Sequence, residues 1–205
     1  MKSYPSIPGK IVDTDIYAFD KLDGSNIRAE WTRKSGSFVK FGSRNRLLGE
    51  DQGKIASASQ QISDVFLNDL NKILKDQRYE RALVFFEYYG PNSFAGFHPD
   101  PVNEMKATLI DVAPYKKGIL PPKEFVQWFG HLDTPDLLYR GKPNQDFVRS
   151  VRRSELEGMT YEGVVCKAQH KIGRAHTMFK IKSVEWLLRL KEYCDGNEHL
   201  YNMLK

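Results

Sequence analysis

Lysines and glutamates at the ends of strand-like runs are the residues in this sequence that could do chemistry together. Lys21 lies in the string Lys-Leu-Asp-Gly-Ser-Asn, and Lys180 and Lys182 alternate around an isoleucine in Phe-Lys-Ile-Lys. Glu87 follows an aromatic run, and Glu162 opens Glu-Gly-Val-Val-Cys-Lys. A lysine amine is a nucleophile only when it is neutral, and nearby cations lower its pKa. Carboxylates are hard oxygen ligands suited to Mg²⁺ or Mn²⁺. A Lys-x-Asp-Gly string alone is more often an ordinary surface turn, so the case depends on the other residues.

Short strands and few helices are predicted to position these residues. Residues 16–31 have the pattern of a hairpin with an Asp-Gly turn at 23–24, and period-two spacing puts Lys180 and Lys182 on the same face of a strand. The other expected strands cover residues 37–43, 82–88, 107–113, 161–167 and 178–182. The pattern indicates an α+β fold with largely antiparallel sheets flanked by helices.

Three helices are expected between and after these strands. Apolar residues recur every three or four positions in 52–77, which predicts an amphipathic helix. Its expected apolar face comprises Ile55, Ala58, Ile62, Val65, Phe66, Leu70, Ile73 and Leu74. A short helix should begin at Pro121–Pro122 and end before Gly130, and a last helix should run from an N-cap at Ser183 to Cys194. Residues 131–160 show no clear pattern, and no linker divides the chain, so we expect a single domain over 1–205.

The composition excludes several classes of protein. The 205 residues carry 31 Lys+Arg against 26 Asp+Glu, a formal net charge of +5, which permits a polyanionic partner. No apolar run approaches the roughly 20 residues needed to span a bilayer, and the N-terminus lacks the apolar region of a signal peptide. The two cysteines, Cys166 and Cys194, cannot build a disulfide framework. A reducing, cytoplasmic-type compartment is therefore expected, with a phage or virus among the conceivable sources.

The order of the motifs resembles that of the covalent nucleotidyltransferases, the superfamily of polynucleotide ligases and mRNA capping enzymes. Lys-Leu-Asp-Gly at 21–24 is similar to motif I, Ser-Arg-Asn-Arg at 43–46 to motif Ia, and Phe-Phe-Glu-Tyr-Tyr-Gly at 85–90 to motif III. Residues 107–112, 162–167 and 179–182 are similar to motifs IIIa, IV and V. The resemblance spans residues 19–182. It implies the nucleotidyltransferase fold, which is similar to that of the ATP-grasp enzymes, and an adenylyltransferase domain.

One residue of motif I favours a branch of this superfamily. DNA ligases and capping enzymes usually have arginine at the sixth position, where this chain has Asn26. Asparagine there resembles the ATP-dependent RNA ligases of the RNA ligase 2 type. The aspartate at the third position, Asp23, instead resembles the residue that DNA ligases have there. We give Asn26 more weight, so a minimal ATP-dependent DNA ligase is the second hypothesis and a capping guanylyltransferase a weaker one.

The resemblance implies a three-step reaction. A lysine amine attacks the α-phosphate of ATP and expels pyrophosphate, which leaves a lysyl-AMP. The AMP then passes to an RNA 5′-phosphate, and a 3′-hydroxyl attacks that activated end and releases AMP. The implied cofactors are ATP and Mg²⁺ or Mn²⁺. The implied partner is RNA with a 5′-phosphate and a 3′-hydroxyl, a nicked duplex included, as in RNA repair, and no membrane.

The resemblance also assigns the site residues. Lys21 is the expected nucleophile, and Lys180 and Lys182 would hold the α-phosphate and offset its charge. Glu162 is the expected metal ligand. The expected nucleotide-binding residues are Asp20 near adenine, Leu22, Asn26 near a phosphate or the metal, Arg44 on ribose and phosphate, Glu87 on a ribose hydroxyl, and Glu162. Arg46 is a less certain neighbour of Arg44.

The chain departs from the family pattern in two places. The motif IIIa segment has no aromatic residue that could stack on adenine, so Leu109, Ile110 or an aromatic elsewhere would have to serve. Residues 183–205 leave no room for the OB-fold or helical domain that follows in larger ligases. The expected explanations are a minimal ligase, a truncated chain, or a protein partner that supplies the missing surface.

Basic residues gather in 167–191, which holds seven Lys or Arg and one acidic residue. This stretch could neutralise RNA phosphates, or it could be an ordinary solvated face. Cys166, Trp31, Trp128 and Trp186 are expected to be packing residues. A rival hypothesis from another class is a non-catalytic nucleic-acid-binding module, but such a module would have no physical reason to keep all five candidate lysines and glutamates. Transfer to a protein or a small molecule is a further alternative.

Overall fold

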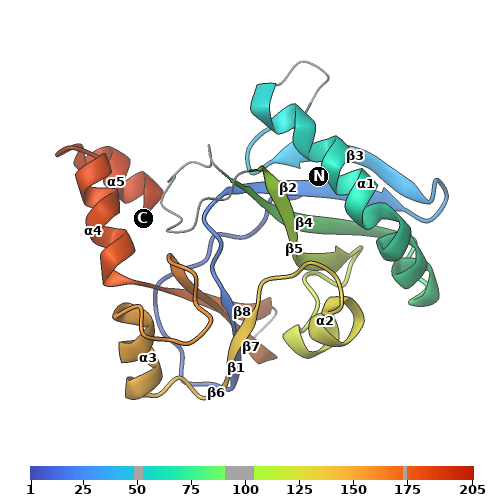
Figure 1. Cartoon of the computed structure of the whole chain (residues 1–205). Helices are drawn as coiled ribbons and strands as arrows, with labels where there is room; N and C mark the ends of the chain where they lie inside the picture. Colours follow the sequence, from blue (N-terminus) through green and yellow to red (C-terminus); the bar gives the residue numbers. More distant parts are fainter. Residues whose placement is uncertain (49–52, 91–103, 173–174) are drawn as a thin grey trace. The chain divides into compact units, whose positions relative to one another are not determined.

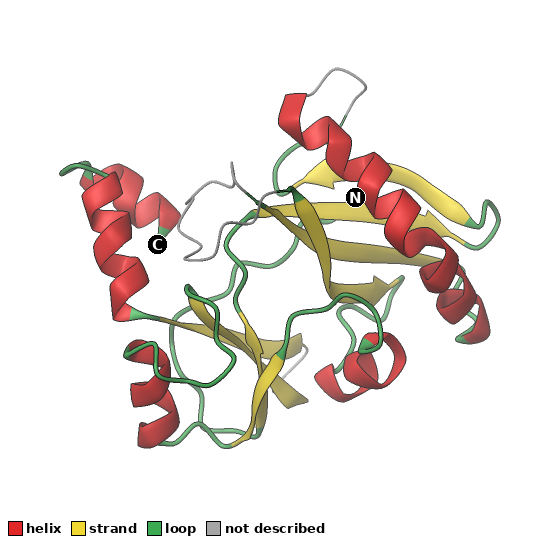
Figure 2. Ribbon diagram, viewed as in Figure 1, coloured by secondary structure: helices red, strands yellow, loops and turns green. Residues whose placement is uncertain are grey.

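The computed structural model describes residues 1–48, 53–90, 104–172 and 175–205. These residues form two compact units, and each unit contains one four-stranded antiparallel sheet. The first unit takes residues Met1–Ser6 and the described chain between Gly24 and Thr134. The second takes Ile7–Asp23 and Pro135–Lys205. The elements are labelled in Figure 1 and coloured by type in Figure 2.

The sheet of the first unit has the strand order β3-β2-β4-β5. Its strands are β2 (Ser25–Thr32), β3 (Ser37–Ser43), β4 (Arg81–Tyr89) and β5 (Lys106–Pro114). Helix α1 (Gly53–Asp76) crosses one face of this sheet (Figure 1), and α2 (Pro122–Phe129) follows β5. The predicted strands and both predicted helices of this unit are confirmed.

The buried stripe of α1 shows why this segment is helical. Ala58, Ile62, Phe66, Leu70 and Leu74 recur every four residues, and each is at most 1% exposed. Burial of such a stripe, rather than local propensity, stabilises a helix of this kind. The prediction that Val65 belongs to this face is wrong, because Val65 is 55% exposed and lies one position off the stripe. The side chain of Ile55 is outside the described part of the structure.

The sheet of the second unit has the strand order β6-β1-β7-β8. Its strands are β1 (Ile16–Asp20), β6 (Leu137–Gly141), β7 (Gly163–Ile172) and β8 (Ala175–Lys182). The helices of this unit are α3 (Gln145–Arg152), α4 (Val184–Tyr193) and α5 (Glu198–Leu204).

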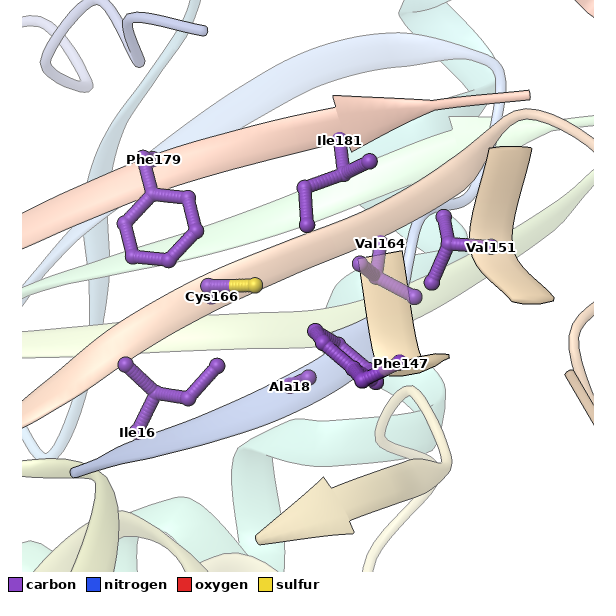
Figure 3. Packing of buried hydrophobic residues seen from close by; sticks show 8 residues of the cluster. All are labelled: Ile16, Ala18, Phe147, Val151, Val164, Cys166, Phe179 and Ile181. Carbon is purple, nitrogen blue, oxygen red and sulfur yellow. The ribbon is translucent and has the colours of Figure 1, made fainter. Parts of the chain in front are cut away.

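A compact apolar core joins this sheet to α3. Phe147 and Val151, one helical turn apart on α3, pack against the strands (Figure 3). The other members are Ile16, Ala18, Val164, Cys166, Phe179 and Ile181. Cys166 is therefore a core residue, as predicted, and burial raises its thiol pKa. The alternation that buries Phe179 and Ile181 turns the lysines between and after them to the opposite face.

The structure corrects the predicted hairpin over residues 16–31. β1 pairs with β6 and β7, whereas β2 pairs with β3 and β4, so the two segments belong to different sheets. Gly24 is needed for close approach rather than for a hairpin turn, because a Cβ there would lie 2.5 Å from the carbonyl oxygen of Tyr88 on β4.

Two further segments differ from the sequence-based expectation. Residues 131–160, which showed no clear pattern, contain β6 and α3. The helix after Ser183 is confirmed, with Ser183 accepting a hydrogen bond from the Trp186 amide, but it is not the last, because α5 follows it. In the part of the chain that the structure describes, no helix combines the length and the apolar character needed to cross a bilayer.

Candidate active site

Three strand ends of the second unit bring the candidate catalytic residues together. Lys21 directly follows β1, Glu162 directly precedes β7, and Lys182 is the last residue of β8. The three strands are neighbours in the order β1-β7-β8. Their pairing is fixed at this edge by the Lys21 amide, which donates to the Gly163 carbonyl at 2.9 Å, and by the register of Gly163 opposite Lys182.

The Glu162 carboxylate bridges the two lysines. Nζ of Lys21 lies 2.7 Å from Oε2 of Glu162, and Nζ of Lys182 lies 2.7 Å from Oε1. The Glu162 and Lys182 side chains are buried, at 3% and 8% exposed, whereas Lys21 keeps 21% of its side-chain surface in solvent. The lysine with the more exposed side chain is thus the predicted nucleophile.

Burial and mutual charge shift the pKa values of this cluster. Burial raises the pKa of Glu162, but the positive charges of Lys21 and Lys182 outweigh this effect, so its net pKa is lowered and the carboxylate stays ionised. Burial lowers the pKa of Lys182 to about 8, against the attraction of Glu162, while Lys21 and Lys180 push it in the same direction as burial. Lys182 is therefore mostly protonated at neutral pH and releases its proton near pH 8.

Gly163 makes this arrangement possible. It has φ +134°, and a Cβ atom there would lie 2.1 Å from the Ile181 carbonyl oxygen. Only glycine accepts both the conformation and the close approach of β8. The backbone on either side of Glu162 is consequently held against β8, and the Ser183 amide completes the contact by donating to the Glu162 carbonyl at 3.0 Å.

Lys180 lies on the same face of β8 as Lys182 but has a different partner. Its Nζ donates to the Lys205 carbonyl oxygen at 2.8 Å, and its backbone amide donates to Pro8 at 2.9 Å. The structure therefore brings Lys180 close enough to influence the charge of Lys182, with its ammonium group directed to the end of the described chain.

Asp20 and Leu22 flank the predicted nucleophile in different environments. Asp20 is buried and accepts hydrogen bonds from the Thr160 amide at 3.0 Å and from its hydroxyl at 2.8 Å. This contact fixes the loop that leads into Glu162. Leu22 is half-buried. Their contacts with a nucleotide stay predictions.

The remaining predicted nucleotide-binding residues belong to the first unit. Asn26 on β2 lies opposite Glu87 on β4, and its side-chain amide donates to the Phe86 carbonyl at 3.4 Å. Arg44 follows β3 and is exposed, as is Arg46. The Arg44 carbonyl accepts a hydrogen bond from Ser3 at 2.8 Å, so the N-terminal residues contact the predicted motif Ia segment.

Two functional candidates were not found from the sequence. Thr160 is the partner of Asp20, and Trp186 is more than the packing residue that was predicted: it is 2% exposed and contacts both Asp23 and Lys182. The spacing of Trp186, four residues after Lys182 and three after a helix N-cap, is the one signal that could have drawn attention to it. Among the described side chains, no group of three or more His, Cys, Asp and Glu residues is arranged to hold a metal ion.

Similar solved structures share this fold. A Naegleria gruberi RNA ligase mutant with AMP and Mn matches with a TM-score of 0.64 at 15% identity, covering 88% of this chain and 53% of that one. The same ligase with pyrophosphate gives 0.62 at 15%, covering 94% and 60%. A proposed ATP-dependent DNA ligase from Aquifex aeolicus gives 0.59 at 17%, covering 100% and 64%. The chain thus spans between half and two thirds of the length of these proteins.

A family model settles the wider relationship. No curated protein matches the chain. The model of the RNA ligase family matches residues 14–182, which contain Lys21, Glu162 and Lys182 as well as both sheets. By this match over most of its length, the chain belongs to the RNA ligase family.

Proposed function

We propose that this chain is the adenylyltransferase domain of an ATP-dependent RNA ligase, with Lys21 as the residue that becomes covalently adenylylated. The observation that carries the proposal is the buried Glu162 carboxylate shared by Lys21 and Lys182. A partly exposed lysine is held at a fixed position beside a second, buried cation. We take the two units to be parts of one domain, as the sequence analysis expects.

The chemistry of the first step follows from these charges. The Lys21 amine gives up its proton to solvent, and its lone pair forms a bond with the α-phosphorus of ATP. The bond between that phosphorus and the bridging oxygen breaks, pyrophosphate leaves with the electron pair, and the Lys21 nitrogen releases a second proton to solvent. Lys182 remains a cation beside the phosphorus and offsets the negative charge that develops on the α-phosphate oxygens. Lys180, on the same face of β8, would add a second positive charge.

Glu162 is the proposed protein ligand of a divalent metal. The carboxylate is 3% exposed, ionised, and already in contact with a positive charge through each oxygen. Mg²⁺ and Mn²⁺ bind to proteins through one or two carboxylates together with substrate phosphates. Glu162 would hold such an ion, which would supply charge neutralisation at the phosphates. The similar Naegleria ligase has been solved with ATP and Mn and with AMP and Mn, which supports this assignment.

The other nucleotide contacts are part of the same proposal. Arg44 would contact ribose and phosphate, Glu87 a ribose hydroxyl, and Asn26 a phosphate or the metal shell. Asp20 and Leu22 would lie beside the nucleotide base. For Asp20, this role is compatible with its hydrogen bonds to Thr160, because the loop that those bonds fix leads into Glu162.

Labelling with ATP tests the first step directly. The protein is incubated with ATP labelled at the α-phosphate and Mg²⁺ or Mn²⁺, and then separated on a denaturing gel. We expect a labelled band that a chelator abolishes and that Lys21→Met removes. Lys142→Met, an exposed lysine of the same unit, is the matched control and should label like the wild type. GTP should not label the protein.

A missing band has two distinguishable causes. Intact mass before and after addition of pyrophosphate shows whether the purified protein already carries AMP. Neither loss nor gain of AMP would overturn the enzymatic proposal in favour of a non-catalytic nucleic-acid-binding module. Labelling of Lys21→Met at the wild-type level would instead overturn the assignment of the nucleophile.

A DNA ligase is the second candidate function. It is favoured by the likeness to the Aquifex protein and by Asp23, whereas the family match and Asn26 favour RNA. Matched nicked duplexes with RNA or DNA at both ends of the nick separate the two. We expect faster joining of the RNA ends with 5′-phosphate and 3′-hydroxyl groups; faster sealing of the DNA nick would reverse the assignment.

We propose that exposed basic residues of 167–191, such as Arg189 and Lys191, contact the RNA backbone. Lys167 is only 4% exposed, so the structure corrects the expectation for this residue. If the exposed residues make these contacts, joining should weaken steeply as salt rises from about 50 to 200 mM, because each neutralised phosphate releases counterions. A flat salt response would remove this part of the proposal. A protein that supplies additional binding surface remains a proposed partner, to be tested by whether the chain alone joins ends after it has been adenylylated.

A further inference from the structure

Trp186, near the beginning of α4, contacts two of the motifs that the proposed reaction requires. Its indole Nε1 donates a hydrogen bond to Oδ2 of Asp23 at 3.2 Å. The Lys182 ammonium lies over the Trp186 ring, 3.5 Å from its centroid, in a cation–π geometry. Trp186 is 2% and Asp23 7% exposed, so both contacts lie away from water, where such interactions are stronger.

The backbone of Trp186 is anchored to the residues next to Glu162 and Lys182. Ser183, which is fully buried, accepts a hydrogen bond from the Trp186 amide at 3.1 Å and donates one to the Tyr161 carbonyl at 2.8 Å. The ring also packs with Tyr161, Leu190 and Cys194 in a small apolar cluster. The indole therefore has little freedom to move, and its contacts restrain Asp23 and Lys182.

We propose that Trp186 is a positioning residue that sets the place of both Lys21 and Lys182. Asp23 is two residues beyond Lys21, so fixing its carboxylate fixes the chain as it leaves β1 and limits where the Lys21 amine can go. Lys182 is held between the Glu162 carboxylate on one side and the indole face on the other. The inference rests on the proposed function and adds to it a residue outside the matched segment 14–182.

The two contacts of Trp186 can be separated by substitution. Trp186→Phe keeps an aromatic face for Lys182 but removes the N–H that holds Asp23. Trp186→Leu removes both. Trp128→Phe, a half-buried tryptophan of the first unit, is the matched control. Unfolding midpoints of all three show how much of any effect is loss of stability.

The expected result is a difference between two steps of the reaction. Lys21 acts covalently in forming lysyl-AMP and in passing its AMP to the RNA, so joining of RNA that already carries a 5′-adenylate does not need its amine. Trp186→Phe should slow formation of lysyl-AMP about 10- to 100-fold, the range caused by small misplacement of a reacting group. It should slow joining of the adenylated RNA at least tenfold less. Trp186→Leu should slow both steps, because Lys182 also loses its aromatic contact.

A conservative and a radical substitution of Asp23 provide a second test of this inference. Asp23→Asn retains an oxygen that accepts the indole hydrogen bond and should keep more of the first step than Asp23→Ala. The double variant Trp186→Phe/Asp23→Ala should be no slower than Asp23→Ala alone, because the shared contact is already lost. Fully additive losses would show that the two residues act separately.

Chemical modification of Lys21 gives a readout that is independent of ligase activity. Reductive methylation followed by peptide mass analysis measures the accessibility of each amine, with Lys142 as the internal reference. In Trp186→Phe, Lys21 should be methylated faster than in wild type, because its amine is less firmly held against Glu162, while Lys142 is unchanged.

The outcomes distinguish this inference from the proposed function. A wild-type protein that never forms lysyl-AMP overturns the proposed function, and the methylation rates still decide the positioning role. Unchanged Lys21 methylation in Trp186→Phe, or equal slowing of both steps in proportion to a lowered unfolding midpoint, would overturn the positioning role and leave Trp186 as a packing residue.

Discussion

Lys21 and Glu162 are 141 positions apart in the sequence, yet Nζ of the first lies 2.7 Å from Oε2 of the second. The contact exists because β1 and β7 are neighbours in one antiparallel sheet and the two residues lie just beyond its paired ends. Lys182 reaches the other carboxylate oxygen from β8. A single buried carboxylate therefore holds two cations in place, and its removal should have large consequences.

Glu162→Gln is expected to reduce both stability and adenylylation. Breaking a buried ion pair by removing one partner typically costs about 3–5 kcal/mol, because it leaves an uncompensated buried charge. Urea unfolding should show a loss of this size, and labelling with ATP should be abolished. Glu157→Gln, an exposed glutamate of the same unit, is the control. Adding Lys182→Met should restore part of the lost stability; if it restores none, the cost does not arise from the stranded lysine.

The elements with a strong local pattern could be predicted from the sequence. The stripe of α1 and the alternation around Lys182 are periodic, the segment that ends at Glu87 is an apolar run of strand length, and Ser183 is a recognisable N-cap. The site residues of the second unit could also be named, because each lies in a short string next to a strand. That Lys21 and Lys182 meet at the Glu162 carboxylate depends on the pairing of β7 with β1 and β8, which the sequence analysis did not predict.

The missed features depend on contacts that are distant in the sequence. The Asp-Gly string at 23–24 has the local chemistry of a hairpin turn, but β1 finds its partners more than 100 residues later, in β6 and β7. β6 carries no buried residue, since its side chains are half-buried or exposed. It therefore lacks the apolar alternation by which strands are recognised. The Trp186–Asp23 hydrogen bond spans 163 positions and has no local signature.

Gly163→Ala should disturb the site without altering any charged group. The added Cβ would lie 2.1 Å from the Ile181 carbonyl oxygen at a φ of +134°, so β7 and β8 must separate where Glu162 meets Lys182. The strained backbone at position 163 alone costs about 1–3 kcal/mol, and the separation of the two strands adds to this cost. We expect a lower unfolding midpoint and at least tenfold slower adenylylation.

Gly9→Ala is the control for this substitution, because nothing lies within 4 Å of a Cβ at position 9. It should match the wild type in both measurements. A Gly163→Ala protein with wild-type adenylylation would show that the strand ends tolerate a wider separation than the hydrogen bonds of Glu162 and Lys21 suggest.

Tyr4→Phe should destabilise the first unit. The Tyr4 hydroxyl donates a hydrogen bond to Asp111, which is fully buried on β5, and the Tyr4 ring packs 5.0 Å from that of Phe85. Burial, and then the charge of Asp111, keeps the pKa of Tyr4 well above its usual value, so the hydroxyl remains a donor at all physiological pH values. Removing the hydroxyl takes a donor from a buried carboxylate, which typically costs about 1–3 kcal/mol.

Urea unfolding of Tyr4→Phe measures this cost, and Tyr115→Phe is the control, because Tyr115 is 61% exposed. Since Ser3 also donates to the Arg44 carbonyl, loosening of residues 1–4 should weaken ATP binding if Arg44 contacts the nucleotide. An unchanged free energy of unfolding would mean that Asp111 does not depend on Tyr4.

The pKa of Lys182 predicts how stability changes at alkaline pH. Burial lowers this pKa from 10.5 to about 8, so between these values the unfolded chain binds a proton that the folded protein has released. Stability contributed by a group increases with pH wherever the unfolded state holds more protons. The folded protein thus bears the full cost of a buried Lys182 cation below about pH 8 and is relieved of it as the pH rises toward 10.5.

The measurement is the difference in free energy of unfolding between wild type and Lys182→Met, taken in a chelator from pH 7 to 10.5. Groups that do not interact with Lys182 titrate alike in both proteins and cancel in this difference. The wild type should gain stability relative to Lys182→Met as the pH rises through this range, and Lys142→Met should show no such trend. If the wild type instead loses stability relative to Lys182→Met, the attraction of Glu162 outweighs burial, and folding does not lower the pKa of Lys182.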